Sequence, residues 1–259
     1  MTASATGYYR AGSSWLHRRH PLTKALAVLL VLVVAFLWPP ISLIALTGGL
    51  VVVAVSARLG GPLVRSLRIP LALLASIVVV NALFFPGGQD VLATLGPLAI
   101  TREGLTFGLV SAGRLLVVFL ALVLFLFTTL ADDLLEALVA RGVSHRIAFV
   151  ILSAVQLVPR MQARASGILA AQQARGLVVG GGIRRRAQVL VPLVVPVLLG
   201  ALVDVRERTF ALEARGFGAR PGRTAYRDVA DPAGDRAIRV GLLVAIAAVT
   251  VGTFLGWPR

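Results

Sequence analysis

Apolar stretches separated by short charged segments dominate the pattern of this chain. Outside residues 132–234, five of the stretches contain no acidic residue and run for 17 residues or more. A helix of that length crosses the hydrocarbon core of a bilayer. We therefore expect five transmembrane helices, at Leu22–Trp38, Ile41–Ala57, Ile69–Phe85, Gly104–Leu130 and Ala237–Leu255.

Prolines and glycines separate the expected spans. Pro39 and Pro40 end the first span, because proline lacks an amide donor and clashes with the preceding helical turn. The first two spans should therefore form a hairpin. The third span ends at Pro86, and a loop that contains Asp90 and Arg102 leads to the fourth.

Composition supports an integral membrane protein. Hydrophobic residues make up 58% of the 259 residues and charged residues only 14%, whereas a soluble domain is about half apolar and a quarter charged. The chain contains no cysteine, which excludes disulfides, thiolate chemistry and cysteine-ligated metals.

The net charge of +15 favours basic cytoplasmic loops over nucleic-acid binding in a membrane protein. Basic residues gather before the first span, between the second and third, and over 132–234. These parts should be cytoplasmic and the C-terminus external. We expect a membrane domain over 1–131 with four spans, a charged region over 132–234, and a final transmembrane helix within 235–259.

Two apolar segments inside the charged region need another interpretation. Ile147–Pro159 and Ala187–Val203 each have arginines on both sides. A transmembrane helix would place one arginine cluster on the wrong face. We expect both segments to form helices along or just under the membrane, although a true span at Ala187–Val203 stays open.

A short motif occurs twice in the charged region. Ala-Ala-Gln-Gln-Ala-Arg-Gly ends at Gly176, and Phe-Ala-Leu-Glu-Ala-Arg-Gly ends at Gly216, forty residues later. Glycine after a helical run is typical of a helix end. An arginine there, Arg175 or Arg215, can reach carboxylates or carbonyls of a partner. One such tip alone would be ordinary helix capping, but two indicate a partner that offers its site twice.

Helical phasing extends each tip into a polar stripe. The small residues beside the arginines, Ala174 and Ala214, would let a partner backbone approach. The stripes contain Arg160, Arg164 and Arg175 in the first copy, and Asp204, Arg208 and Arg215 in the second.

These motifs resemble the T component, or transmembrane scaffold, of energy-coupling factor transporters (the EcfT/CbiQ-like family). The resemblance covers nearly the whole chain. It rests on the opening segment Leu16–Lys24, on Thr101–Leu105 through Gly113-Arg114, on Thr128–Leu138, and on Ala174-Arg175-Gly176 and Ala214-Arg215-Gly216, the latter followed by Phe217-Gly218. In the opening, the family usually has Asp-Pro where this chain has His20-Pro21.

The resemblance implies an all-α polytopic fold in a bacterial or archaeal plasma membrane. In such transporters the T component links a membrane substrate-binding subunit (the S subunit) to two cytoplasmic ABC-type ATPases. Each motif arginine docks on one ATPase, and ATP-driven motion of the coupling helices brings a vitamin or a transition-metal ion into the cell. By position, the ATPase contacts are Ala174, Arg175, Gly176, Ala214, Arg215 and Gly216.

Catalytic and cofactor motifs are not expected. Lys24, the only lysine, stands between Thr23 and Ala25, whereas a P-loop needs a glycine-rich turn before lysine and a hydroxyl residue after it. An ATPase must therefore act in trans. The three histidines (His17, His20 and His145) have no nearby carboxylate or cysteine, so we expect no metal site.

The acidic cluster Asp132, Asp133 and Glu136 has two interpretations. It could be the catalytic carboxylates of a lipid-modifying membrane enzyme, but we favour capping at the start of a helix. Arg114 lies inside the fourth span and either pairs within the bundle or faces a partner. We expect Asn81 to form a helix–helix hydrogen bond. A self-sufficient secondary transporter or channel is the main alternative function, although no expected span contains the acidic residue that ion coupling favours.

Overall fold

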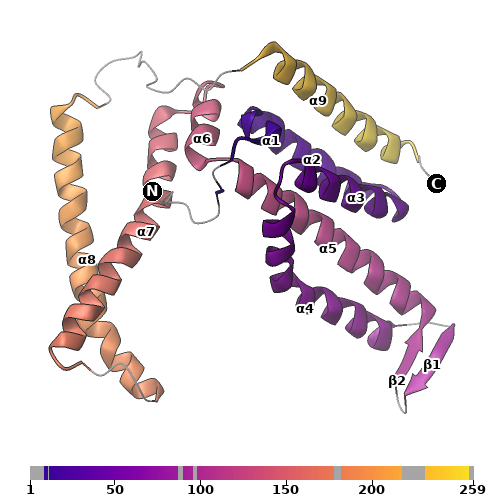
Figure 1. Ribbon diagram of the computed structural model, residues 1–259, viewed down its shortest axis with the longest axis horizontal. Helices are drawn as coiled ribbons and strands as arrows, with labels where there is room; N and C mark the ends of the chain where they lie inside the picture. Colours follow the sequence, from indigo (N-terminus) through magenta and orange to yellow (C-terminus); the bar gives the residue numbers. More distant parts are fainter. Residues whose placement is uncertain are drawn as a thin grey trace. The chain divides into compact units, whose positions relative to one another are not determined.

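The computed structural model describes residues 9–10, 12–86, 90–95, 98–177, 182–217 and 231–256. The chain divides into two compact units. The unit called here the membrane unit contains most helices and a β-hairpin (Figure 1). Its elements are α1 Trp15–Arg18, α2 Pro21–Leu37, α3 Ile41–Ser56, α4 Gly60–Phe84, β1 Val91–Leu95, β2 Leu98–Thr101, α5 Arg102–Thr128, α6 Ala131–Val139 and α9 Ala233–Phe254.

The helices confirm the expected polytopic helical membrane protein. Among the described residues, α4, α5 and α9 are long and apolar enough to cross a membrane. Helices α2 and α3 are apolar but have 17 and 16 residues, which corresponds to about 24 to 26 Å of helix. That they also span the bilayer stays a prediction.

Two helix starts and one loop differ most from the sequence-based expectation. Helix α4 begins at Gly60, nine residues early, and continues through Pro70, so Arg65 and Arg68 lie on its first turns rather than in a loop. The expected loop before α5 contains the antiparallel pair β1–β2. Helix α9 begins at Ala233. Each extension adds polar helical turns that hydropathy alone does not detect.

Helix α5 is the centre of the membrane unit and packs against α2, α3 and α4. Its residues Val117 and Leu120 are almost fully buried. On the α4 side, Gly108 lies so close that an added Cβ would stand 3.1 Å from the Cα and the carbonyl oxygen of Val78. Small residues at such positions let membrane helices approach closely. The expected interhelical hydrogen bond of Asn81 is wrong, because its Nδ2 donates to the carbonyl oxygen of Ile77 in the same helix, at 2.8 Å.

Charged residues tie the N-terminal segment to α9. The buried Asp235 carboxylate accepts from Arg19 Nη1 at 2.7 Å and from the His20 amide at 2.6 Å. Arg239, also buried, donates to His20 Nδ1 at 3.0 Å and to both carboxylate oxygens of Asp231 at 2.6 and 2.7 Å. The hydrogen bonds from Arg239 hold the pKa of the Asp231 carboxyl below its usual range.

His20 begins α2 as its N-cap, followed by Pro21 at the first helical position. Its Nδ1 accepts from the amide of Leu22 at 3.2 Å as well as from Arg239. Both partners can only donate, so Nδ1 carries no proton and the imidazole is neutral. The ring nitrogen thus performs the capping that a carboxylate oxygen performs in Asp-Pro.

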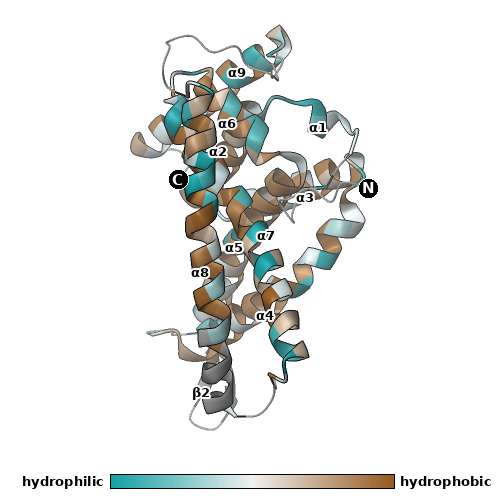
Figure 2. Cartoon of the chain, turned by 90° about the vertical axis from the view of Figure 1, so that its left-hand side faces the viewer, coloured by the Kyte–Doolittle hydropathy of each residue, from teal (hydrophilic) through white to brown (hydrophobic). Residues whose placement is uncertain are grey.

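The second unit contains two long helices, α7 His145–Ala174 and α8 Ile183–Ala214, which pack against each other. The two apolar segments Ile147–Pro159 and Ala187–Val203 lie within them. Figure 2 shows apolar and polar residues mixed along α7 and α8. Large apolar side chains such as Val150, Leu198 and Phe210 are more than half exposed. How these helices lie relative to a membrane stays a prediction.

Candidate functional site

The repeated motif forms the C-terminal ends of α7 and α8. Helix α7 ends at Ala174, with Arg175 as its C-cap residue, and α8 ends at Ala214, with Arg215 in the same place. The glycines that follow have positive φ values of 92° at Gly176 and 69° at Gly216. Glycine adopts this left-handed conformation without the steric cost that a Cβ imposes.

Both helix ends form the same pair of backbone hydrogen bonds. After α7, the amide of Leu177 donates to the carbonyl oxygen of Gln172 at 3.0 Å, and that of Gly176 donates to Gln173 at 2.9 Å. After α8, Phe217 donates to Leu212 and Gly216 to Glu213, each at 2.9 Å. This double pattern is the Schellman motif, so the repeat in sequence is also a repeat in structure.

The motif residues lie at the surface in both copies. Ala174, Arg175 and Gly176 are exposed, as are their counterparts Ala214, Arg215 and Gly216. Neither guanidinium forms a hydrogen bond or ion pair with another residue in the described ranges. Each lies at the negative end of its helix dipole, where a cation is favourable. Both arginines are therefore available to acceptors of a partner.

An ion pair joins the two helices at equivalent positions. Arg164 Nη2 donates to Asp204 Oδ1 at 3.0 Å, and Nη1 lies 2.9 Å from Oδ2. Arg164 also lies over Gly200, where an added Cβ would stand 2.8 Å from Nη1. Each member of the pair precedes its motif arginine by 11 residues, or about 16 Å of helix.

The end of α8 also packs against the beginning of α7. The Phe217 ring lies 5.0 Å from the Phe149 ring and 6.2 Å from the His145 ring, measured between centroids. Together with the ion pair, this contact shows that α7 and α8 run antiparallel where they cross. The two arginine tips therefore lie on opposite sides of the crossing, at equal distances along their helices.

The other residues of the expected polar stripes lie either between the two helices or at the surface. Arg164 and Asp204 are used between the helices, at about one third exposure each. Arg160 and Arg208 are exposed and have no polar partner among the described residues. The stripes are thus divided between an internal ion pair and surface arginines.

The remaining candidate residues are located in the membrane unit. Asp132 and Asp133 lie in the first turn of α6, where their charge suits the helix dipole. The guanidinium of Arg114 lies 5.8 Å from the centre of the Phe36 ring, which is a cation–π contact within the bundle. In the described part of the chain, no three His, Cys, Asp or Glu side chains gather as a metal site would require.

Comparison with known proteins identifies the family. Residues 12–226 match the model of the cobalt transport protein family CbiQ. The chain belongs to this family. Among its relatives is the energy-coupling factor transporter transmembrane protein EcfT of Acidaminococcus fermentans, 30% identical over 99% of this chain and 98% of that protein. The EcfT protein of Heliobacterium modesticaldum is 32% identical over 91% and 92%, and that of Lacticaseibacillus paracasei is 33% identical over 85% and 88%.

The predicted family resemblance is thereby confirmed. This CbiQ/EcfT family member is a component of a membrane transport system. Both Ala-Arg-Gly motifs lie inside the matched range. The Arg164–Asp204 pair was not foreseen as a pair, although a signal existed. The two residues stand forty positions apart, the same spacing as the motif arginines. The cluster of Asp231, Asp235 and Arg239 had no comparable signal.

Proposed function

We propose that this chain is the transmembrane coupling subunit of an energy-coupling factor importer. It transmits ATP-driven motion from two cytoplasmic ATPase subunits to a membrane substrate-binding subunit. The observation that carries the proposal is the pair of identical helix ends, each with one exposed arginine at the same distance from the ion pair of Arg164 and Asp204.

The two helix ends carry the same residues and therefore suit a partner that presents the same site twice. Arg175 would dock on one ATPase subunit and Arg215 on the other, each guanidinium donating to carboxylates or carbonyls in a groove. The neighbouring Ala174, Gly176, Ala214 and Gly216 are small and would let the groove close around each tip. When the ATPases move on binding or hydrolysing ATP, the docked ends of α7 and α8 would move with them.

The crossing point would convert this motion into movement of the whole helix pair. Arg164 and Asp204 hold α7 and α8 together between the tips. A displacement of either tip would therefore also move the other helix. The S subunit would bind the exposed apolar surfaces of α7 and α8. Tilting or release of the S subunit would then deliver the substrate.

The proposed orientation follows from the basic residues. The N-terminal segment and the 132–234 region would be cytoplasmic, which places both tips where soluble ATPases can reach them. The family description, cobalt transport protein, supports transport of a transition metal, and a vitamin is the other substrate class that the family resemblance implies. Selection of the substrate would belong to the S subunit.

The proposal is tested by charge reversal at the two tips. R175E and R215E, singly and together, would be expressed together with the ATPase and S subunits of the transporter. Each single variant should lower the recovery of co-purified ATPase about tenfold, because a docked arginine is a typical hot spot. The double variant should retain none while remaining in the membrane fraction.

R206E is the matched control. Arg206 is an exposed arginine of α8 outside the polar stripe, and its reversal should leave ATPase recovery unchanged. Recovery of the ATPases with the double variant at the wild-type level would disprove docking through the tips. Substrate uptake by this chain alone, without any ATPase, would instead favour a self-sufficient transporter.

A further inference from the structure

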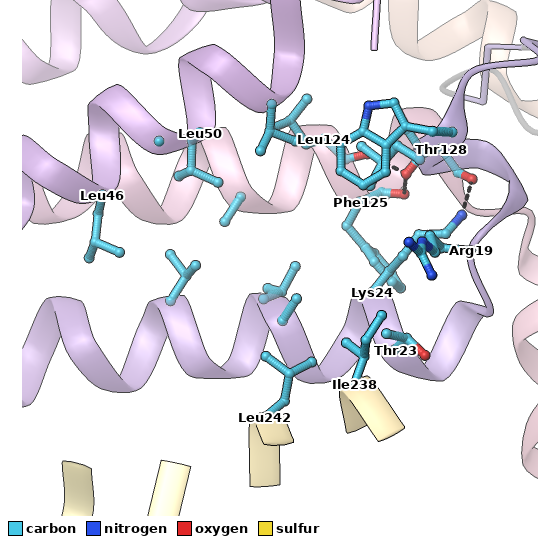
Figure 3. Close-up of a pocket in the computed structure, with 18 of the residues that line it drawn as sticks. Arg19, Thr23, Lys24, Leu46, Leu50, Leu124, Phe125, Thr128, Ile238 and Leu242 are labelled. Atoms are coloured by element: carbon cyan, nitrogen blue, oxygen red, sulfur yellow. Dashed lines mark hydrogen bonds between the residues drawn. The ribbon is translucent and has the colours of Figure 1, made fainter. Parts of the chain in front are cut away.

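A cavity of about 450 Å³ lies within the membrane unit. Helices α2, α3 and α5 line most of it, and Ile238 and Leu242 of α9 contribute to one side (Figure 3). It has no role in the proposed docking of ATPases, since it shares no residue with the tips of α7 and α8.

The two ends of the cavity differ in chemistry. Figure 3 shows Arg19, Lys24 and Thr128 gathered at one end, whereas Leu46 lies at the other. Apart from Thr23, the rest of the lining is apolar and includes the aromatic rings of Trp15 and Phe125. The cavity is therefore amphipathic, with one basic end and a long apolar body.

The basic end is formed by Lys24 and Arg19 of the lining, and the carboxylates of Asp133 and Asp235 lie near enough to act on Lys24. Lys24 Nζ donates to the carbonyl oxygens of Thr128 at 2.6 Å and His17 at 3.5 Å, and it has no ion pair in the described ranges. The nearby Arg10 lies over the Phe127 ring at 5.2 Å. Arg19 is 41% exposed and uses only Nη1 on Asp235, which leaves other N–H groups of its guanidinium for a further acceptor.

The body of the cavity is open along α3. Ala45 and Gly49 line it and are exposed, and a Cβ added at Gly49 would meet no atom within 4 Å. The lining residues of α3 extend from Ala45 to Val53, about 12 Å of helix. One leaflet forms half of a hydrocarbon core about 30 Å thick, so this length covers most of one leaflet.

We propose that this cavity binds one anionic phospholipid. Its acyl chain lies along Gly49 and Leu46, and its phosphate accepts hydrogen bonds from Arg19 at the basic end, with Lys24 supplying further positive potential. Basic pockets between membrane helices on the cytoplasmic side recognise anionic headgroups in this way. With the N-terminal segment cytoplasmic, as proposed above, the lipid belongs to the inner leaflet.

The dimensions favour a lipid over a partner helix. The helices that line the cavity contact one another, α2 with α3, α5 and α9, and α3 with α5. A transmembrane helix with its side chains is about 10 Å wide, which is too wide to enter between helices already in contact. An acyl chain is narrow enough, and the basic end matches its charged headgroup.

Two neighbouring glycines provide a matched test. Gly49 lines the cavity, whereas Gly48 does not, and an added Cβ at either position meets no atom within 4 Å. G49L therefore fills the cavity and G48L is its control. The full-length wild type and both variants would be purified in mild detergent and incubated with phosphatidylglycerol or phosphatidylcholine. Native mass spectrometry would then measure lipid retained per chain.

The proposal predicts preferential retention of one phosphatidylglycerol by the wild type and by G48L. G49L should bind it about tenfold more weakly, because each displaced methylene contributes about 0.8 kcal/mol and 1.4 kcal/mol is tenfold. Equal retention by G49L and G48L would overturn the site, and equal retention of the two lipids would overturn recognition of the anionic headgroup. Loss of a membrane partner from G49L with lipid retention unchanged would also overturn the proposal and assign the cavity to that partner.

Discussion

The carboxylate of Asp204 holds the guanidinium of Arg164 at two points, and each residue lies 11 positions before the motif arginine of its own helix. Equivalent positions of the two copies of the repeat thus bind each other. The crossing of α7 and α8 lies at the same distance along the helix from Arg175 as from Arg215. A force applied at either arginine therefore acts on the crossing over the same length of helix. In the proposed function, this symmetry would let the helix pair couple evenly to two ATPase subunits.

Loss of the Arg164–Asp204 pair should loosen the crossing without unfolding the protein. Both side chains are about one third exposed, so D204A should cost only about 1 kcal/mol of stability. The distance between the tips should become more variable. The chain has no cysteine, so spin labels on cysteines introduced at the exposed Gln173 and Glu213 would report that distance alone.

The charge-swapped variant R164D/D204R is the control for this prediction. It restores opposite charges at the crossing, and the distribution of distances between the labels should narrow again. A distribution in D204A as narrow as that of the wild type would mean that the ion pair does not define the crossing.

The positive φ of Gly176 should make it intolerant of even one added carbon. G176A adds a Cβ in open space, but a φ of 92° strains any residue with a side chain, at a cost of about 1 to 2 kcal/mol. The end of α7 should shift and ATPase co-purification should fall. Gly167, within α7 and equally open, has no positive φ, so G167A should be neutral or stabilising by about 0.4 to 1 kcal/mol. Similar ATPase recovery from both variants would show that the conformation of the tip is unimportant.

Titration of His20 should make stability depend on pH. Burial of the imidazole, followed by the positive charge of Arg239, lowers the pKa of His20 from 6.5. The unfolded chain therefore takes up this proton at a higher pH than the folded chain, and the free energy of unfolding should fall as the pH is lowered below about 6.5. Thermal unfolding in detergent between pH 7.5 and 5 would measure this loss.

H20D is the informative comparison for that measurement. An aspartate at this position offers acceptors to the Leu22 amide and to Arg239 and does not titrate between pH 5 and 7. Asp231, whose pKa is lowered by the hydrogen bonds from Arg239, should lose its stabilising effect only in more acid solution. The slope between pH 7.5 and 5 should therefore flatten in H20D, and an unchanged slope would assign it to another group.

The contact of α4 with α5 should depend on the absence of a side chain at Gly108. The Cα and carbonyl oxygen of Val78 would lie 3.1 Å from a Cβ there, and backbone atoms cannot move aside cheaply. G108L should therefore destabilise the membrane unit by about 1 to 3 kcal/mol or more, measured as a lower unfolding temperature. G241L, in α9 where a Cβ meets nothing within 4 Å, should leave the temperature unchanged. Equal temperatures for the two variants would contradict the close helix contact.

Local sequence determined the helices and the two tips. Hydropathy located all five apolar helices to within a few residues, except that α4 begins nine residues early, because its first turns carry Arg65 and Arg68. The Ala-Arg-Gly motifs marked the ends of α7 and α8 because glycine after a helix reflects a backbone requirement that acts within four or five residues. The motifs also carried the family resemblance, which the comparisons confirmed.

Only the tertiary structure decided which helices meet. Phasing placed Arg164 and Asp204 on polar stripes, but it could not show that they bind each other rather than a partner, because helical periodicity defines a direction around one axis and not the neighbour found there. The same reason hid the network that joins His20 to Arg239, whose members are 219 residues apart. The cavity between α2, α3 and α5 likewise exists only once three helices pack together, since no single helix encloses a volume.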